Sequence, residues 1–172
     1  MFKTGAKALL RLALIFSFQQ IFELPVKSQP ALETLAQTNQ DLTCLSQRTL
    51  LLNASNGLLY PSESDYPFQY FYNSQAFSLS SAQEFTRLIG KQGQPVTQVD
   101  FDQFFNQLLD NLRSSGAEAE TLKRYQSLRE VFKTRFTTLT VYRVGQIQVQ
   151  VYIIGVNSAC GIAGLKIISI ET

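Results

Sequence analysis

The stretch QIQVQVYI, residues 146–153, decides the fold, because its apolar residues alternate strictly with polar ones. This period is typical of a strand that is buried on one face and wet on the other. Such a strand belongs to an antiparallel sheet or to a sheet face open to water. Residues 142–144, just before Gly145, indicate its hairpin partner, and Gly155 to Gly161 is expected to turn the chain into a last strand over 165–170. A C-terminal β-meander is predicted.

Helical patterns dominate the chain before this meander. Asn56-Gly57 supplies a stop for the first helix, Ser81 and Glu84 form a capping box for a short one, and Asp100 is the expected N-cap of a third. Helices packed over a mostly antiparallel sheet make an α+β domain. The expected helices run over 32–56, from 82 onward, over 101–109 and over 122–136, and the further expected strands over 68–72 and 95–99.

The N-terminal segment, residues 1–30, differs from the rest of the chain. Three basic residues precede an apolar run at 12–18, and small residues follow at 26–28, which is the outline of a signal peptide. The run is too short for a permanent membrane span. Two interpretations stay open: export to the periplasm or outside the cell, or a disordered N-terminal extension of a cytoplasmic protein. In both, residues 31–172 form the folded domain.

Charge and composition exclude several functions. The net charge is +2, but residues 1–30 hold four of the 15 basic and one of the 13 acidic residues, so the remainder has 11 positive and 12 negative charges. The basic character therefore gives no reason to expect binding to nucleic acid. Because the chain has no His, a Cys/His nucleophile and a zinc site are both disfavoured. Cys44 and Cys160 could pair if the protein is exported, or be two thiols if it is cytosolic.

The segment YPSESDYPF, residues 60–68, places two carboxylates, Glu63 and Asp65, between prolines and aromatics. Proline fixes its own φ and favours extended backbone in the residue before it, so this loop is predicted to be stiff. From loop chemistry alone, Glu63 is a surface acid in a turn, Ser62 or Ser64 is a local cap, and Asp65 positions the loop through backbone N–H groups.

Several blocks along the chain together resemble the nuclease A inhibitor family, whose members block sugar-nonspecific, magnesium-dependent nucleases. The resemblance covers the chain from about Leu42 to its last residue. The blocks are ASNGLLYPSESDYPF at 54–68, VDFDQFF at 99–105, VYRVG at 141–145, VYIIG at 151–155, and IAG at 162–164 running to the terminal Glu171-Thr172.

This resemblance implies an α/β/α sandwich and an inhibitor rather than an enzyme. In the family, one Glu of the loop enters the nuclease active site and coordinates its catalytic metal, and the terminal Thr contributes nearby; the matching positions here are Glu63 and Thr172. Ser62, Ser64 and Asp65 would flank that contact. The expected partner is a nuclease with its own Mg²⁺, the inhibitor needs no cofactor of its own, and a monomer is expected.

Two departures from the family pattern keep an alternative open. The family is acidic and carries a Trp in an acidic segment, whereas residues 31–172 are close to neutral and the matching stretch, 113–120, has no Trp. Electrostatic steering would be weaker and an aromatic anchor is missing. The alternative is an exported or envelope-associated interaction domain that keeps the fold without inhibiting a nuclease.

Overall fold

The computed structural model describes residues 30–76, 78–79 and 81–171, and the side chains of Pro30, Ala31, Leu32 and Thr34 are not described. The predicted N-terminal extension, residues 1–30, therefore lies outside the described residues except for the backbone of Pro30. None of the helices in the described part of the chain combines the length and apolarity that a membrane span requires.

A five-stranded sheet forms the centre of the fold, and all its neighbouring strands are antiparallel, in the order β3-β7-β6-β5-β4. The predicted C-terminal meander is confirmed, because β5, β6 and β7 pair in sequence. The strands are β3 (Gln69–Asn73), β4 (Val96–Asp100), β5 (Thr137–Val144), β6 (Gln148–Asn157) and β7 (Gly161–Ile170).

The turn before β7 is shorter than predicted. Strand β6 runs on to Asn157, so Gly155 lies inside the strand and only residues 158–160 reverse the chain. A Cβ at Gly155 would be 2.5 Å from the Cβ of Phe136. This glycine therefore serves close packing rather than a turn.

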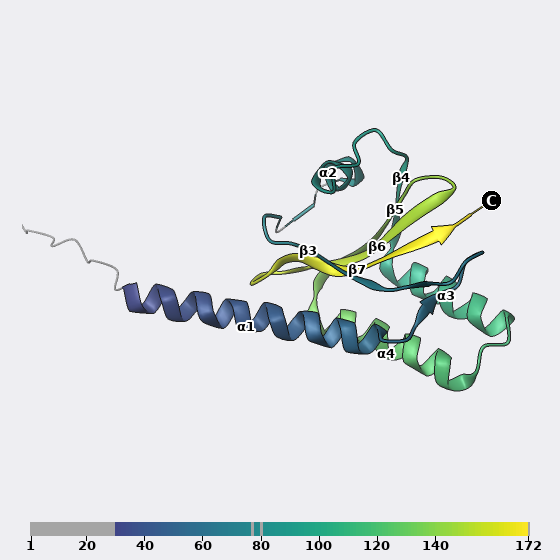
Figure 1. The fold of residues 1–172 in the computed structure, drawn as a ribbon, viewed down its shortest axis with the longest axis horizontal. Coiled ribbons are helices and arrows are strands. Elements are labelled where there is room, and N and C mark those ends of the chain that lie inside the picture. The colour runs from purple at the N-terminus through teal and green to yellow at the C-terminus, as the bar shows by residue number, and fades with distance from the viewer. Residues whose placement is uncertain (1–29, 77, 80, 172) are drawn as a thin grey trace, which may run out of the picture.

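Helices cover both faces of the sheet, which confirms the predicted α+β sandwich. Figure 1 shows α2 on one face, and α1, α3 and α4 on the other. Two separate hydrophobic clusters result, one on each face. The helices are α1 (Pro30–Ser55), α2 (Ala82–Leu88), α3 (Phe101–Ser114) and α4 (Ala119–Arg135). The predicted caps are confirmed: Asp100 accepts from the Gln103 N–H at 2.8 Å, and Ser81 from the Glu84 N–H at 3.1 Å.

The alternating strand β6 is wet on one face only at its beginning. Gln148 is exposed and Gln150 half-buried, but Tyr152 and Ile154 further along the same face are buried. The reason is Phe85 of α2, whose ring stacks on Tyr142 at 4.3 Å between centroids and meets Tyr152 edge-on at 5.0 Å. The prediction of one wet face is therefore wrong for the second half of the strand.

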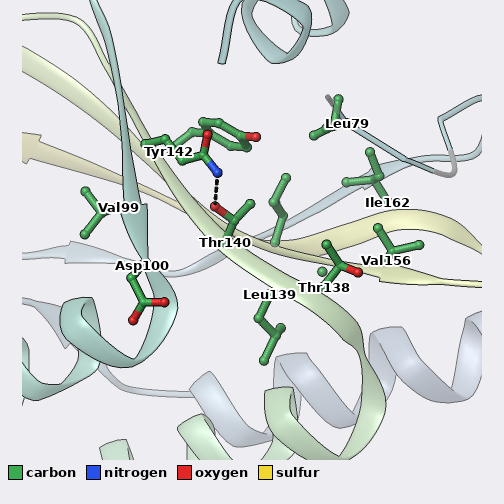
Figure 2. A pocket seen from close by; sticks show the side chains of 12 residues that line it. Leu79, Val99, Asp100, Thr138, Leu139, Thr140, Tyr142, Val156 and Ile162 are labelled. Atoms are coloured by element: carbon green, nitrogen blue, oxygen red, sulfur yellow. Dashed lines mark hydrogen bonds between the residues drawn. The ribbon is translucent and has the colours of Figure 1, made fainter. Parts of the chain in front are cut away.

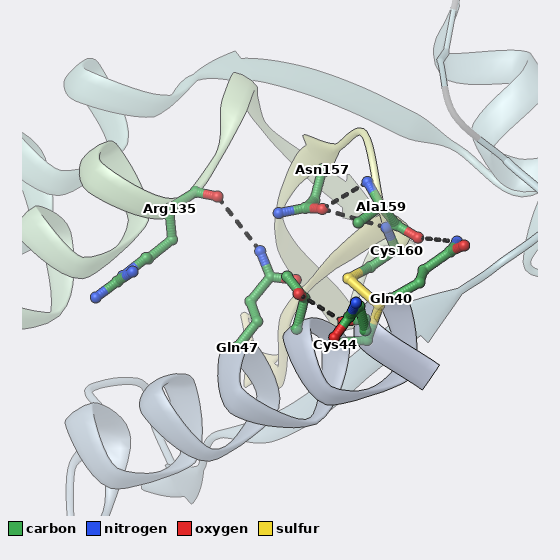
Figure 3. Close-up of a disulfide and its surroundings, with 9 residues drawn as sticks. Gln40, Cys44, Gln47, Arg135, Asn157, Ala159 and Cys160 are labelled. Atoms are coloured by element: carbon green, nitrogen blue, oxygen red, sulfur yellow. Dashed lines mark hydrogen bonds between the residues drawn. A yellow bond between two sulfur atoms is a disulfide. The ribbon is translucent and has the colours of Figure 1, made fainter. Parts of the chain in front are cut away.

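A disulfide between Cys44 and Cys160 joins α1 to the end of the β6–β7 turn, directly before β7 (Figure 3). Around it, the Gln40 side chain donates to the Ala159 carbonyl, and the Gln47 side chain donates to the Arg135 carbonyl at 3.3 Å. The sequence left two thiols as an alternative. In this fold the two cysteines are brought together, with Cα atoms 5.5 Å apart.

Candidate functional site

The loop that carries Glu63 is a small hairpin. Strands β1 (Leu59–Tyr60) and β2 (Tyr66–Pro67) pair in antiparallel register, with Tyr60 opposite Tyr66. At the tip, the Ser62 hydroxyl donates to the Ser64 carbonyl at 2.5 Å and accepts from the Ser64 N–H at 3.4 Å. Glu63 lies between these serines and is exposed. Ser62 therefore closes the turn that presents the Glu63 carboxylate.

Aromatic side chains hold the base of this hairpin against the helical layer. The ring of Tyr60 stacks on Phe104 of α3, with centroids 6.0 Å apart and planes 4° from parallel. The Tyr125 hydroxyl, from α4, donates to the Leu59 carbonyl. Phe68, just after β2, is buried and packs edge-on against Tyr125 at 6.4 Å. Both ends of the hairpin are thus fixed to the body of the protein.

The tyrosines at the base remain uncharged over a wide pH range. Burial raises the pKa of Tyr125 to about 12, and the negative charge of Asp65 contributes in the same direction. Burial also raises the pKa of Tyr60, although the positive charge of Arg143 opposes that shift. Asp65, on the β2 side of the tip, is exposed like Glu63.

The end of β7 lies beside this hairpin. A cleft of about 290 Å³ is lined by Pro61 and Ser62 from the hairpin and by Ile170 and Glu171 from the C-terminal end. Figure 1 shows the C-terminus at the same end of the molecule as the segment between β1 and β3. Thr172, predicted as the second contact residue, lies outside the described residues.

An ion pair that sequence analysis missed organises the cleft. Arg143 of β5 pairs with Glu171, which also accepts from the Ser169 hydroxyl at 2.9 Å. The Glu171 N–H donates to the Ile147 carbonyl at 2.9 Å. These bonds fix the backbone up to the residue before Thr172. Arg143 stands in an ordinary strand pattern, and nothing local links it to a residue 28 positions later.

Other candidate sites are explained by structure. Asp100 and Asp102 could suggest a metal pair, but Asp100 caps α3 and Asp102 binds Arg129 at 2.6 Å and Lys133 at 3.3 Å. The hydrogen bond from Arg129 lowers the pKa of Asp102. Within the described residues, no group of three or more His, Cys, Asp or Glu side chains is placed to hold a metal ion.

A cavity of about 510 Å³ opens on the α2 face of the sheet, beside β4 and β5 (Figure 2). Its lining is a mixture of aliphatic side chains with Thr138, Thr140 and Tyr142. The Gln98 amide donates to the Thr140 hydroxyl at 3.3 Å, and Asp100 is used as a helix cap. The residues that line this cavity form no arrangement of groups that indicates a reaction.

Comparison with known proteins places most of the folded domain in a family. No curated protein matches the chain. The sequence profile of the family described as nuclease A inhibitor-like protein matches residues 45–172, which include the Glu63 hairpin, the whole sheet and the C-terminal residues. The chain therefore belongs to the nuclease A inhibitor-like family.

Proposed function

We propose that this protein inhibits a sugar-nonspecific, magnesium-dependent nuclease by inserting the Glu63 hairpin into the nuclease active site. The observation that carries the proposal is the exposed Glu63 at the tip of a hairpin whose base is fixed on α3 and α4. Mg²⁺ prefers oxygen ligands and usually keeps several waters. The Glu63 carboxylate can therefore take a coordination position that substrate phosphate needs. The metal belongs to the nuclease, and the inhibitor itself performs no reaction.

The braced base of the hairpin supports this role. Ordering a flexible segment on binding costs about 1 kcal/mol per residue in backbone entropy. Here Pro61, Pro67 and the stacked Tyr60 ring restrict the hairpin before binding, so less of that cost falls on the complex. Ser62, Ser64 and Asp65 are proposed to contact the nuclease around the metal.

Thr172 is proposed as the second contact, because the backbone before it is fixed next to the hairpin. Glu171 is paired with Arg143, and both line the same cleft as Pro61 and Ser62. An oxygen from the terminal residue and one from Glu63 would then approach the nuclease from the same end of the inhibitor. We also propose that the protein works outside the cytoplasm, since disulfides such as Cys44–Cys160 persist in oxidising compartments.

An inhibition assay tests this mechanism. The target is a purified magnesium-dependent nuclease from the same organism, with DNA and RNA as substrates. Glu63→Gln removes the charge but keeps the shape, and it should weaken inhibition by about 2–5 kcal/mol, the range for losing a buried charged contact. Glu130→Gln is the matched control, because Glu130 is exposed on α4 and does not line the cleft between the hairpin and the C-terminal end.

The alternative is an interaction domain that recruits some other exported protein. The near-neutral charge of residues 31–172 favours it, because a phosphate-binding nuclease would attract a more acidic surface. Nuclease capture with and without a chelator separates the two functions. Weaker capture after Mg²⁺ removal supports inhibition through Glu63, whereas equal potency of Glu63→Gln and the parent protein would refute it.

A further inference from the structure

Helix α1 carries an apolar stripe that faces solvent. Leu35, Leu42 and Leu45 are 61%, 59% and 57% exposed, although they recur at helical spacing like the residues of a buried face. Thr38 and Thr49, which are exposed, and the half-buried Leu52 continue the same stripe. Figure 1 shows α1 along one edge of the molecule, with its N-terminal turns reaching beyond the sheet. Large aliphatic side chains in such a contiguous row mark an interaction surface.

The fold fixes this stripe in its outward orientation. The opposite side of α1 is attached to the body by the Cys44–Cys160 disulfide, by the buried Gln47 and by Leu51, which is 0% exposed (Figure 3). The helix cannot rotate about its axis to bury the leucines without breaking these contacts. Only a partner from outside the described domain could therefore cover the three exposed leucines.

The order of residue types along the stripe is the same from either end of the helix. Its residues are Leu35, Thr38, Leu42, Leu45, Thr49 and Leu52, separated by three, four, three, four and three positions. The mean spacing of about 3.5 residues is that of a coiled-coil seam. A twofold interface requires a surface that is complementary to itself. A palindromic stripe meets this requirement when two copies run antiparallel.

The family resemblance led us to expect a monomer, but we propose that two copies of this chain associate through α1 in an antiparallel, twofold-symmetric helix pair. The axis passes between residues 43 and 44, so that Leu35 faces Leu52, Thr38 faces Thr49 and Leu42 faces Leu45 of the other copy.

Charge supports the antiparallel arrangement. Asp41 and Arg48 lie on the same flank of the stripe, seven residues apart, and both are exposed. In the proposed pair, Asp41 of each copy lies near Arg48 of the other, which makes two equivalent opposite-charge contacts across the axis. A parallel pair would instead place this flank of each helix beside the opposite flank of its partner, so the contact between Asp41 and Arg48 would not form. Arg48 also lies over the Tyr70 ring at 5.7 Å, which keeps it on this flank.

The interface is small, so the dimer is expected to be reversible. The stripe extends over 18 residues, from Leu35 to Leu52, and these two residues are about 25 Å apart along the helix. An interface of this size falls in the range of weak, transient association, with dissociation in the micromolar range.

Half of the stripe precedes residue 45, where the family match begins, so the surface is not contained in the part of the chain that defines the family.

Sedimentation velocity of the full chain under oxidising conditions, from about 1 to 200 µM, tests the proposal across the expected range of dissociation constants. The parent protein should shift from monomer to dimer. Leu42→Asp should raise the dissociation constant at least tenfold, and Gln37→Asp, at an exposed position off the stripe on the same helix, should leave it unchanged. Thermal unfolding of each variant confirms that the monomer is intact.

A charge exchange tests the antiparallel geometry. Asp41→Arg and Arg48→Asp should each weaken the dimer. The double variant should recover most of the loss, because opposite charges then face one another again with their signs exchanged. A monomer at all concentrations, a dimer that Leu42→Asp leaves unchanged, or a double variant weaker than both single ones would overturn the proposal. So would monomeric protein that binds phosphatidylglycerol vesicles through Leu42, since the stripe would then face a lipid surface.

Discussion

Reduction of the Cys44–Cys160 disulfide should strongly destabilise the protein. The bond closes a loop with a sequence separation of 116 residues, which spans most of the folded domain. In the chain-entropy treatment, a cross-link of this length lowers the entropy of the unfolded chain enough to stabilise the fold by about 5 kcal/mol. This is a large share of the total free energy of unfolding of a domain, which is usually about 5–15 kcal/mol.

The reduced protein should still fold, because the covalent bond is not the only attachment of α1. Leu51 is fully buried in the cluster shared with α3 and α4, and the Gln47 amide remains bonded to Arg135. The loss should therefore appear mainly as a lower free energy of unfolding, with a fall in Tm of roughly 10–15 °C for a chain of this size. Amide exchange should rise first in the part of α1 before Cys44, which the disulfide anchors to the sheet.

Urea unfolding of the oxidised and reduced protein measures the difference. The variant carrying Cys44→Ala and Cys160→Ala is the control, and its stability should match that of the reduced parent and not respond to reductant. If the oxidised and reduced forms differed by less than about 1 kcal/mol, the loop-closure reasoning would be refuted for this fold. Equal exchange rates throughout α1 in both forms would show that the bond does not anchor its N-terminal half.

Two further predictions concern the hairpin base and the sheet. The pKa of Tyr125 is raised to about 12, so its contribution to stability is complete below pH 10, the ordinary tyrosine pKa, and is lost as the pH rises toward 12. In urea unfolding, Tyr125→Phe should therefore make the fall in stability over this range less steep. A Cβ at Gly164 would lie 2.0 Å from the Ile153 carbonyl oxygen, so Gly164→Ala should lower the free energy of unfolding by about 1–3 kcal/mol or more. Unchanged stability in urea unfolding would contradict the close approach of β6 and β7.

Local patterns predicted the elements of this fold well, because caps, glycines and alternation act over a few residues. They failed to predict burial where it depended on an element distant in the sequence. The helix predicted over 32–56 is confirmed as α1, but the side that faces the body includes the polar residues Gln47 and Ser55. Their amide and hydroxyl groups find carbonyl partners in Arg135 and Leu51, which the sequence pattern cannot show. Periodicity identifies an apolar face but not what covers it.

The candidate site shows the same division. The exposure of Glu63 follows from the turn residues around it, so sequence analysis could locate it. The pairing of Arg143 with Glu171 and the stacking of Tyr60 on Phe104 depend on three-dimensional proximity, and each joins residues at least 28 positions apart. Family resemblance supplied the link between the loop and the C-terminal end. In the structure, the two segments line one cleft.

The two proposed surfaces are compatible with one another. The Glu63 hairpin and the end of β7 lie beyond the C-terminal end of α1, whereas the exposed stripe continues toward the opposite, N-terminal end (Figure 1). In an antiparallel helix pair, the C-terminal ends of the two α1 helices point in opposite directions. Each hairpin would then face away from the other copy, and a nuclease bound at one would not block the second. If both proposals hold, the dimer is a bivalent inhibitor, and the complex should contain two nucleases for every two inhibitor chains.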